Sequence, residues 1–429
     1  MTGEYASVLK NRTFAIFFGG QTVSTIGDVL FTFSVMWAVM KRTDSPLDVT
    51  VVPLVSMLIA TFTSIPMATL ADRLPRKLAL VGSDVFRALS IAIIAFLFWN
   101  HRSTVLELYA ANVVIQFAGQ LFGPAISGVL PEILNNAKAE LAAANALMSM
   151  TGQSVSFFAY AVGGVLIATL GVKMALLVDA ISFAVSALSL WVITMPDTRE
   201  LTSIRILKAS ERIRAFARDM VVGFDFILNR KNFVALIIFI AAANLVANAF
   251  TILTVPYSAQ VLHGTARIYG LLQMADLAGG LIGAYLAGKY SNRLKLWQWA
   301  VIALVGTGGS LIGLGVIATF PTAVLFLIVL NVVMTLFNIP FMTSVQLLVP
   351  ESMRGRVMTT FVFLISGLSS PIGLVLGGWL MTKYGIRPVL VATGTALIML
   401  ALTSFKVAAF REDPDLQVGF TTTRNSAAE

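Results

Sequence analysis

Long apolar runs separated by short polar segments dominate this chain. Twelve runs, each bounded by charged residues, proline or glycine, cover residues 14–40, 49–70, 78–99, 105–130, 145–170, 173–195, 233–258, 269–288, 296–319, 322–349, 357–382 and 388–410. A helix of about 20 apolar residues crosses a hydrocarbon core about 30 Å thick. Because a backbone in lipid must satisfy its own hydrogen bonds, we predict twelve transmembrane helices and an all-α membrane protein.

The composition agrees with a chain whose main solvent is lipid. Of the 429 residues, 57% are hydrophobic and only 12% are charged. Soluble domains average about 25% charged residues, so this chain has too few charges to cover an ordinary water-facing surface. The length alone would suggest two or three soluble domains, but the apolar runs exclude that interpretation.

The distribution of Lys and Arg predicts the orientation. If the N-terminus is cytoplasmic, the inner segments carry 22 of these residues and the outer loops carry 7, while Arg87 lies inside a span. Cytoplasmic loops are enriched in Lys and Arg, so we expect both termini on the cytoplasmic side. The net charge of +9 then faces anionic lipid, and we expect no nucleic-acid partner.

The longest connection divides the spans into six and six. We predict an N-terminal six-helix bundle at 1–195, a cytoplasmic linker at 196–232, a C-terminal bundle at 233–410 and a tail at 411–429. Within the linker, apolar residues recur at helical spacing over 213–228, with arginines on the opposite face. This pattern predicts an amphipathic helix that lies at the inner membrane interface.

The second half repeats motifs of the first half in the same order. Asn112-Val113-Val114 recurs as Asn331-Val332-Val333 and Pro131-Glu132 as Pro350-Glu351, both 219 residues later, and Gly163-Gly164 with Gly171 recurs as Gly377-Gly378 with Gly385, 214 residues later. Transporters with two parallel six-helix halves bind their substrate between the halves, near the bilayer midplane. The repeat therefore predicts two pseudo-symmetric halves around one pathway.

The loop between the second and third spans carries a family resemblance. The stretch from Ala68 to Lys77 reads ATLADRLPRK, which resembles the signature G-x-L-A-D-R-x-G-R-K of the major facilitator superfamily at this position. Ala68 and Pro75 replace its two glycines, and the charged pattern is intact. The resemblance, which covers nearly the whole chain, implies the major facilitator fold, and in that family this loop latches the inner gate. It assigns gating to Asp72, Arg73, Arg76 and Lys77.

Further motifs resemble the bacterial drug-efflux branch of this superfamily, which includes macrolide and siderophore exporters. They are Gln21-x-x-Ser24-x-x-Gly27-Asp28 in the first span and the two Pro-Glu turns. The resemblance implies a monomeric drug–proton antiporter in the bacterial cytoplasmic membrane. Two patterns depart from it: the fifth span has Ala159-Tyr160-x-x-Gly163-Gly164 where antiporters have G-P-x-x-G-G, and the fourth span lacks the arginine of R-x-x-Q-G.

Acidic residues inside spans are the main candidates for the chemistry. A charge at membrane depth costs about 2.5–3.5 kcal/mol on insertion scales, so each one needs a reason. Asp28 lies near the middle of the first span, which lines the cavity in the resembled family. We interpret it as a group that alternately binds a proton and a cationic or hydrogen-bonding substrate; the alternative is an Asp paired for packing. Asp276 in the eighth span is the second candidate, and for Asp179 in the sixth we expect a structural role.

Amide side chains follow the first, fourth, seventh and tenth spans, the cavity helices of the resembled fold. They are Gln21, Asn112, Gln116, Asn244, Asn248, Asn331 and Asn338. They either bind the substrate or hold helices together by hydrogen bonds. Asp84 and Arg87 are three residues apart on the third span and face the same side, so they can pair. This pair is either structural or takes part in gating in place of the arginine missing from the fourth span.

The predicted function is a secondary active transporter that exports an amphipathic small molecule, driven by inward proton flow. The alternatives are a transporter of lysophospholipid or another lipid, and a non-transporting membrane receptor. The sequence has no G-x-x-x-x-G-K-S/T loop for nucleotide binding, no cysteine and two scattered histidines, so we expect neither an enzyme nor a cofactor or metal. The expected partners are the substrate, protons and membrane lipid.

Overall fold

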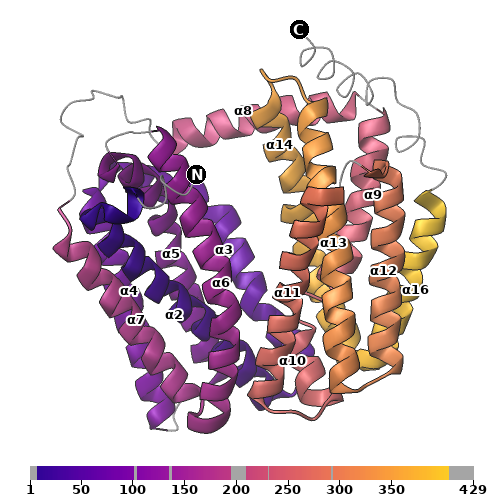
Figure 1. Ribbon diagram of the computed structural model, residues 1–429, viewed down its shortest axis with the longest axis horizontal. Coiled ribbons are helices and arrows are strands. Elements are labelled where there is room, and N and C mark those ends of the chain that lie inside the picture. Colours follow the sequence, from indigo (N-terminus) through magenta and orange to yellow (C-terminus); the bar gives the residue numbers. More distant parts are fainter. Residues whose placement is uncertain are drawn as a thin grey trace. The chain divides into compact units, whose positions relative to one another are not determined.

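The computed structural model describes residues 7–100, 104–134, 138–194, 209–229, 231–290 and 293–404 (Figure 1). Within these ranges the chain is helical and contains no strand. It divides into two compact units: unit 1 is Met1–Asp44, Val51–Ile213 and Thr265–Gly270, and unit 2 is Ser45–Thr50, Arg214–Gly264 and Leu271–Glu429. The predicted tail 411–429 and residues 196–208 of the predicted linker lie outside the described residues.

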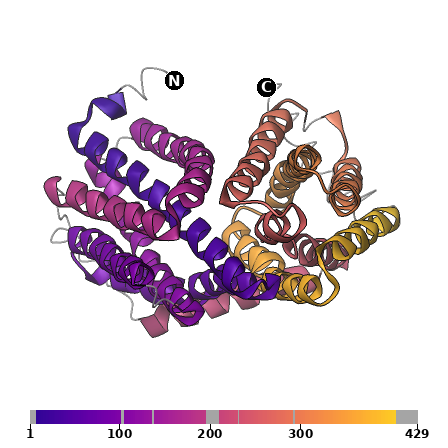
Figure 2. The same ribbon diagram turned by 90° about the horizontal axis from the view of Figure 1, so that it is seen from below.

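Each unit is a bundle of long helices, seen from below in Figure 2. The long helices that lie wholly or mainly in unit 1 are α2 (Arg12–Thr43), α3 (Pro46–Arg73), α4 (Arg76–Trp99), α5 (Val105–Ile133), α6 (Lys138–Leu170) and α7 (Val172–Val192). Those of unit 2 are α8 (Ala209–Leu228), α9 (Lys231–Asn248), α11 (Ala266–Tyr290), α12 (Leu296–Val316), α13 (Phe320–Leu348), α14 (Arg354–Val362), α15 (Ser369–Tyr384) and α16 (Ile386–Ser404). Shorter elements of unit 2 are α10 (Thr254–Pro256) and the π-helical turns η2 (Tyr257–Val261) and η4 (Phe363–Leu368).

The predicted transmembrane architecture is confirmed. In the described part of the chain, ten helical segments are long and apolar enough to cross a membrane, and α14, η4 and α15 together form one of them. Two shorter apolar helices, within α9 and α16, stand at the seventh and twelfth predicted spans. The predicted and observed helices agree in order and number.

Helix α4 shows how these helices are matched to lipid. Its buried face holds Ser83, Asp84 and Arg87. Its exposed face carries large apolar side chains at helical spacing, among them Leu78, Phe86, Leu89, Ile93 and Phe96. A surface helix of a soluble protein has the opposite arrangement, with its apolar stripe against the core. The exposed face of α4 is therefore suited to hydrocarbon, and its charges are hidden among neighbouring helices.

The seventh span differs from the prediction of one continuous helix over 233–258. Helix α9 ends at Asn248, and the next backbone amides, of Phe250 and Thr251, bond to carbonyls three residues earlier instead of four. Pro256 explains why the α-helix cannot simply continue, because proline lacks an N–H and its ring clashes with the carbonyl of residue i−4. The span resumes with α10 and η2, so it is discontinuous.

The sequence repeat has a counterpart in the backbone. Gly171 and Gly385, which occupy matching places in the two halves, both have positive φ values, +83° and +84°. Each stands directly before the last described helix of its unit, α7 or α16. Side chains with a Cβ rarely adopt this conformation, so glycine permits the same tight helical turn in both halves.

Helix α8, which lies in the predicted linker, packs on α14 within unit 2. Asp219 and Arg356 form an ion pair at 2.9 Å, but both side chains are exposed, so the pair adds little stability. The buried contact is Thr360, whose hydroxyl lies 3.4 Å from the Met220 carbonyl and against Gly223. A cavity of about 280 Å³ remains between the two helices. The position of α8 at the membrane interface stays a prediction.

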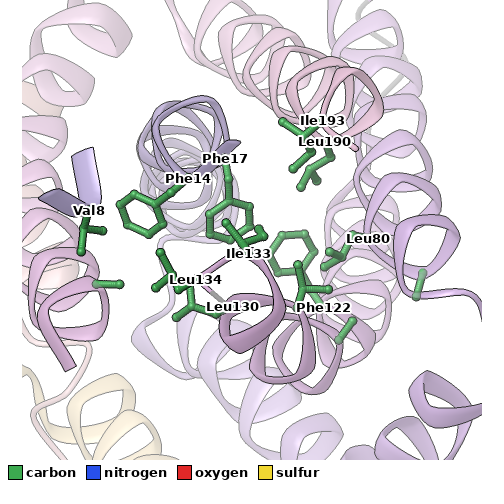
Figure 3. Packing of buried hydrophobic residues seen from close by; sticks show 14 of the residues in the cluster. Val8, Phe14, Phe17, Leu80, Phe122, Leu130, Ile133, Leu134, Leu190 and Ile193 are labelled. Atoms are coloured by element: carbon green, nitrogen blue, oxygen red, sulfur yellow. The ribbon is translucent and has the colours of Figure 1, made fainter. Parts of the chain in front are cut away.

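An apolar cluster closes the end of unit 1 where α2 begins and α5 and α7 end. Phe14 and Phe17 of α2 are fully buried there, against side chains that include Leu80, Leu130 and Ile193 (Figure 3). The rings of Phe14 and Phe18 stack at 5.7 Å between centroids. Because the cluster contains residues of all six helices from α2 to α7, it holds α2, α4 and α7 in one register.

We expect Phe17→Ala to destabilise unit 1 by about 3–5 kcal/mol, the usual loss for removing a buried aromatic ring. Phe62→Ala is the matched control, because that ring is 74% exposed on α3 and its removal leaves no cavity. Thermal or SDS unfolding of the purified protein measures both. Equal losses for the two variants would contradict the importance of this cluster.

Candidate functional site

A polar seam runs between α2 and α7 in unit 1. The Gln21 amide donates to the Ser186 hydroxyl at 3.1 Å. Two glycines of α2 lie against the same face of α7: a Cβ added to Gly20 would meet Ser189, and one added to Gly27 would meet Ser182 and Asp179. In these contacts, higher residue numbers on α2 pair with lower residue numbers on α7, so the two helices are antiparallel. Small residues let their backbones approach closely.

Asp84 and Arg87 of α4 are buried beside this seam. Ser186 donates to Asp84 Oδ2 at 2.6 Å, and Arg87 Nη1 lies 3.9 Å from Asp84 Oδ1. The guanidinium also faces the rings of Phe183 and Phe122, at 5.1 and 5.7 Å from their centroids. The expected pairing of the two side chains is therefore present, and its role in gating stays a prediction.

Asp179 of α7 is more isolated. Its side chain is fully buried, and neither carboxyl oxygen has a hydrogen-bond partner in the described part of the chain. The nearby Ser182 hydroxyl donates to the backbone carbonyl of Asp179 at 2.8 Å. Arg87 and Asp28 act on this carboxyl electrostatically, and the Ser182 hydroxyl interacts with it weakly. A buried polar group without a partner is uncommon and calls for an explanation.

Asp28, the first predicted site residue, lies near the middle of the 32-residue helix α2. Its side chain is exposed, in contrast to Asp84 and Asp179. Arg87 attracts it electrostatically. One exposed acid, two buried acids and one guanidinium therefore interact inside unit 1. Such a set can accept and release protons.

The amides of unit 1 divide into two kinds. Asn112 of α5 is buried, and its Nδ2 donates to the Val52 carbonyl of α3 at 2.9 Å. Gln116, one turn further along α5, is partly exposed, as is Gln21. The contact of Asn112 favours helix packing for that residue. Substrate binding by the others stays a prediction.

In unit 2, Asp276 of α11 accepts a hydrogen bond at 2.5 Å from the amide of Asn331 on α13. These two predicted residues are therefore brought together. Asn244 and Asn248 donate to carbonyls of their own helix, at 3.1 and 2.8 Å, near the point where the seventh span breaks. Asn338 is exposed on α13.

The signature loop holds helix ends together inside unit 1. Arg76 forms an ion pair with Glu132 and donates to the Gly128 carbonyl, both at the end of α5. Lys77 donates to the Ile193 carbonyl at 3.0 Å, just after α7. Cations are favourable at helix C-termini, where carbonyls lack partners. Arg73 is exposed, and the side chain of Asp72 lies outside the described residues.

Sequence reasoning missed the serines on α7 and expected only a structural role for Asp179. Ser182, Ser186 and Ser189 follow Asp179 at intervals of three or four residues, so the four share one face of the helix. That polar stripe was visible in an otherwise apolar run and is the signal that could have found them. In the described part of the chain, no group of three or more His, Cys, Asp or Glu is arranged to hold a metal ion.

Comparison with known proteins gives a consistent result. The sequence model of the Major Facilitator Superfamily matches residues 17–373. A macrolide efflux protein A of Streptococcus pyogenes is 21% identical, over 91% of this chain and 94% of the relative. The multidrug efflux pump Tap of Mycolicibacterium fortuitum is 26% identical, over 88% and 91%.

Solved structures show the same fold at low identity. A bacterial homologue of the iron transporter ferroportin aligns with a TM-score of 0.71 and 15% identity, covering 92% of this chain and 98% of that one. The nucleoside transporter NupG aligns with a TM-score of 0.70 and 14% identity, covering 92% and 99%.

We expect Asn112→Ala to destabilise the protein by on the order of 0.6–1.7 kcal/mol, the range measured for hydrogen bonds between membrane helices. Gln116→Ala, one turn away on α5, is the control and loses less. Unfolding in detergent measures the stability, and equilibrium binding of erythromycin or ethidium measures the site. A loss of affinity without a loss of stability would place Asn112 in the binding site.

Gly27→Ala tests the close approach of α2 to α7. The new methyl group would collide with Ser182 and Asp179, so we expect a loss of about 1–3 kcal/mol from overpacking. Gly19→Ala, on the same helix, adds its methyl group to open space and serves as the control. An equal stability of the two variants would show that the helices are further apart.

Proposed function

This chain belongs to the Major Facilitator Superfamily, and we propose that it is a secondary active transporter that exports an amphipathic small molecule in exchange for protons. It works by alternating access in the bacterial cytoplasmic membrane, with both termini on the cytoplasmic side. The multi-pass architecture and the family supply the transporter framework. The proton coupling, the direction and the substrate class are the proposal.

The position of Asp28 is the observation on which the proposed proton coupling rests. Asp28 is an exposed carboxylate halfway along a helix of membrane-spanning length, where an acid without a function would be costly. The buried Arg87 interacts with it electrostatically. An exposed acid beside a buried cation is suited to exchange protons for a cationic or hydrogen-bonding substrate.

The relatives support the substrate class. A macrolide efflux protein and a multidrug efflux pump match this chain over about nine-tenths of its length. The chain is also rich in residues that suit adaptable apolar binding, with 29 Phe and 17 Met. A bulky, mostly apolar molecule with few polar groups fits these features better than a sugar, which needs many hydrogen bonds.

The test uses inverted vesicles with an acidic lumen and a panel of erythromycin, ethidium, a hydroxamate siderophore and a lysophospholipid. We expect the pH gradient to drive uptake of erythromycin or ethidium. In Asp28→Asn this gradient-driven uptake falls by at least about tenfold, or about 1.4 kcal/mol of lost coupling, because an amide cannot exchange a proton.

Asp28→Glu is the matched control, since it keeps the carboxyl group and retains part of the gradient-driven uptake. Expression and melting temperature in detergent show whether each variant is folded. Full activity of Asp28→Asn would remove Asp28 from the coupling. Transport of the lysophospholipid alone, independent of the gradient, would replace the drug-export proposal with lipid transport.

A further inference from the structure

Asp179 has no role in the function as described so far, yet its environment is unusual. Its carboxyl group is fully buried between α7 and α2, and neither oxygen accepts a hydrogen bond of good geometry among the described residues. The nearby Ser182 hydroxyl donates to a backbone carbonyl and interacts with the carboxyl only weakly, and Arg87 acts on the carboxyl without forming an ion pair. An ionised carboxylate in such a place has little compensation, and a poorly compensated buried charge is unfavourable. A protonated carboxylic acid is neutral and so avoids the cost of a buried charge.

The charges around Asp179 support the same conclusion. Three helices pack on α7: α2, α4 and α6. Helix α2 contributes Asp28, and α4 contributes Asp84 and Arg87. The charged residues of α6, Lys138 and Glu140, lie in its first turn, at the end far from its connection to α7, and Tyr160 is its other titratable residue.

The single guanidinium of Arg87 therefore interacts with three acidic side chains. Arg87 pairs with Asp84, which also accepts the Ser186 hydroxyl, and Asp28 is exposed to solvent. Asp179 is the buried acid that forms no ion pair among the described residues and accepts no hydrogen bond of good geometry. If all three acids were ionised, the group would carry two uncompensated negative charges at membrane depth.

Gly27 brings Asp179 next to the exposed acid. The backbone of α2 at Gly27 lies so close that an added Cβ would collide with Asp179 Oδ1 and Ser182 Oγ. Asp28 is the next residue along α2 and interacts electrostatically with Asp179. An exposed carboxyl and a buried one therefore lie within the range of direct electrostatic interaction, on either side of the contact at Gly27.

We propose that Asp179 holds the coupling proton of this transporter and exchanges it with Asp28 past Gly27, an inference that deepens the proposed function and rests on it. In the exchange, the Asp28 carboxylic acid gives its proton to the Asp179 carboxylate, which leaves Asp28 ionised and Asp179 neutral. Asp28 is then free to bind a cationic group without a second negative charge beside it. The reverse transfer returns the proton to the solvent-accessible residue. The two acids titrate as one coupled pair.

Infrared spectroscopy of the purified protein tests this without any substrate. A protonated carboxyl group that accepts no hydrogen bond gives a distinct carbonyl stretching band. We expect this band in the wild type, its loss in Asp179→Asn, and its persistence in Asp276→Asn, which removes a hydrogen-bonded acid of unit 2. In Asp28→Asn the band remains, but its hydrogen–deuterium exchange slows by about tenfold, or about 1.4 kcal/mol in the barrier, because the relay is missing.

Transport assays then distinguish a proton-carrying role of Asp179 from a role in packing. In proteoliposomes, Asp179→Asn keeps exchange of ethidium or erythromycin down their gradients but loses most of the drive from a pH gradient, and Asp179→Glu restores part of it. A wild-type band that persists in Asp179→Asn, or normal pH-driven transport in that variant, overturns the proposal.

Two outcomes separate this inference from the proposed function. If Asp179→Asn does not fold, the exchange rate of the native band in Asp28→Asn decides, and an unchanged rate overturns the relay. If the wild type transports neither probe, the proposed function fails for these substrates, while the infrared bands still show whether Asp179 holds a proton that Asp28 exchanges.

Discussion

The high energy of a charge in hydrocarbon is the constraint on which unit 1 depends. Helix α4 has an apolar outer face, so its Asp84 and Arg87 must lie between helices, and α2 and α7 supply the surfaces that cover them. The covering requires close contact, which explains the glycines of α2 and the serines of α7 at their crossing. In this unit, the close packing of the helices and the burial of their polar and charged side chains therefore depend on one another.

The buried acids of unit 1 are not equally compensated, and we relate this difference to function. A fully compensated buried pair would hold two helices together and do nothing more. Here Asp84 accepts a hydrogen bond from a hydroxyl and pairs with a guanidinium, whereas Asp179 has neither a hydrogen bond of good geometry nor an ion pair among the described residues. Unsatisfied polar groups in an otherwise well-packed bundle are expected at functional sites, where stability is given up for chemistry.

Unit 2 uses similar residues differently. Its in-span acid Asp276 has a direct amide partner in Asn331, and no second acid or arginine interacts with it in the described residues. Its seventh span is broken just after two amides and a few residues before a proline, which leaves irregular backbone where unit 1 has a continuous helix. The two units therefore share a repeat and a fold but not a polar network, and the proton chemistry proposed here belongs to unit 1.

The sequence by itself determined the fold class, because the length of an apolar run and the cost of an unsatisfied backbone in lipid are local properties. The twelve spans, the signature loop and the repeated glycines at positive φ all follow from residues close together in the chain. It also predicted the pairing of Asp84 with Arg87, since three residues on a helix define one face. It did not predict the break after Asn248, although Pro256 was visible.

Only the tertiary structure decided which polar groups meet. Asn112 and Asn331 occupy matching places in the repeat, yet one bonds to a backbone carbonyl and the other to Asp276. Asp28 and Asp179 are about 150 residues apart in sequence, and the antiparallel register of α2 and α7 brings them together. That register depends on close packing over several turns of both helices, so no single segment of the sequence contains it.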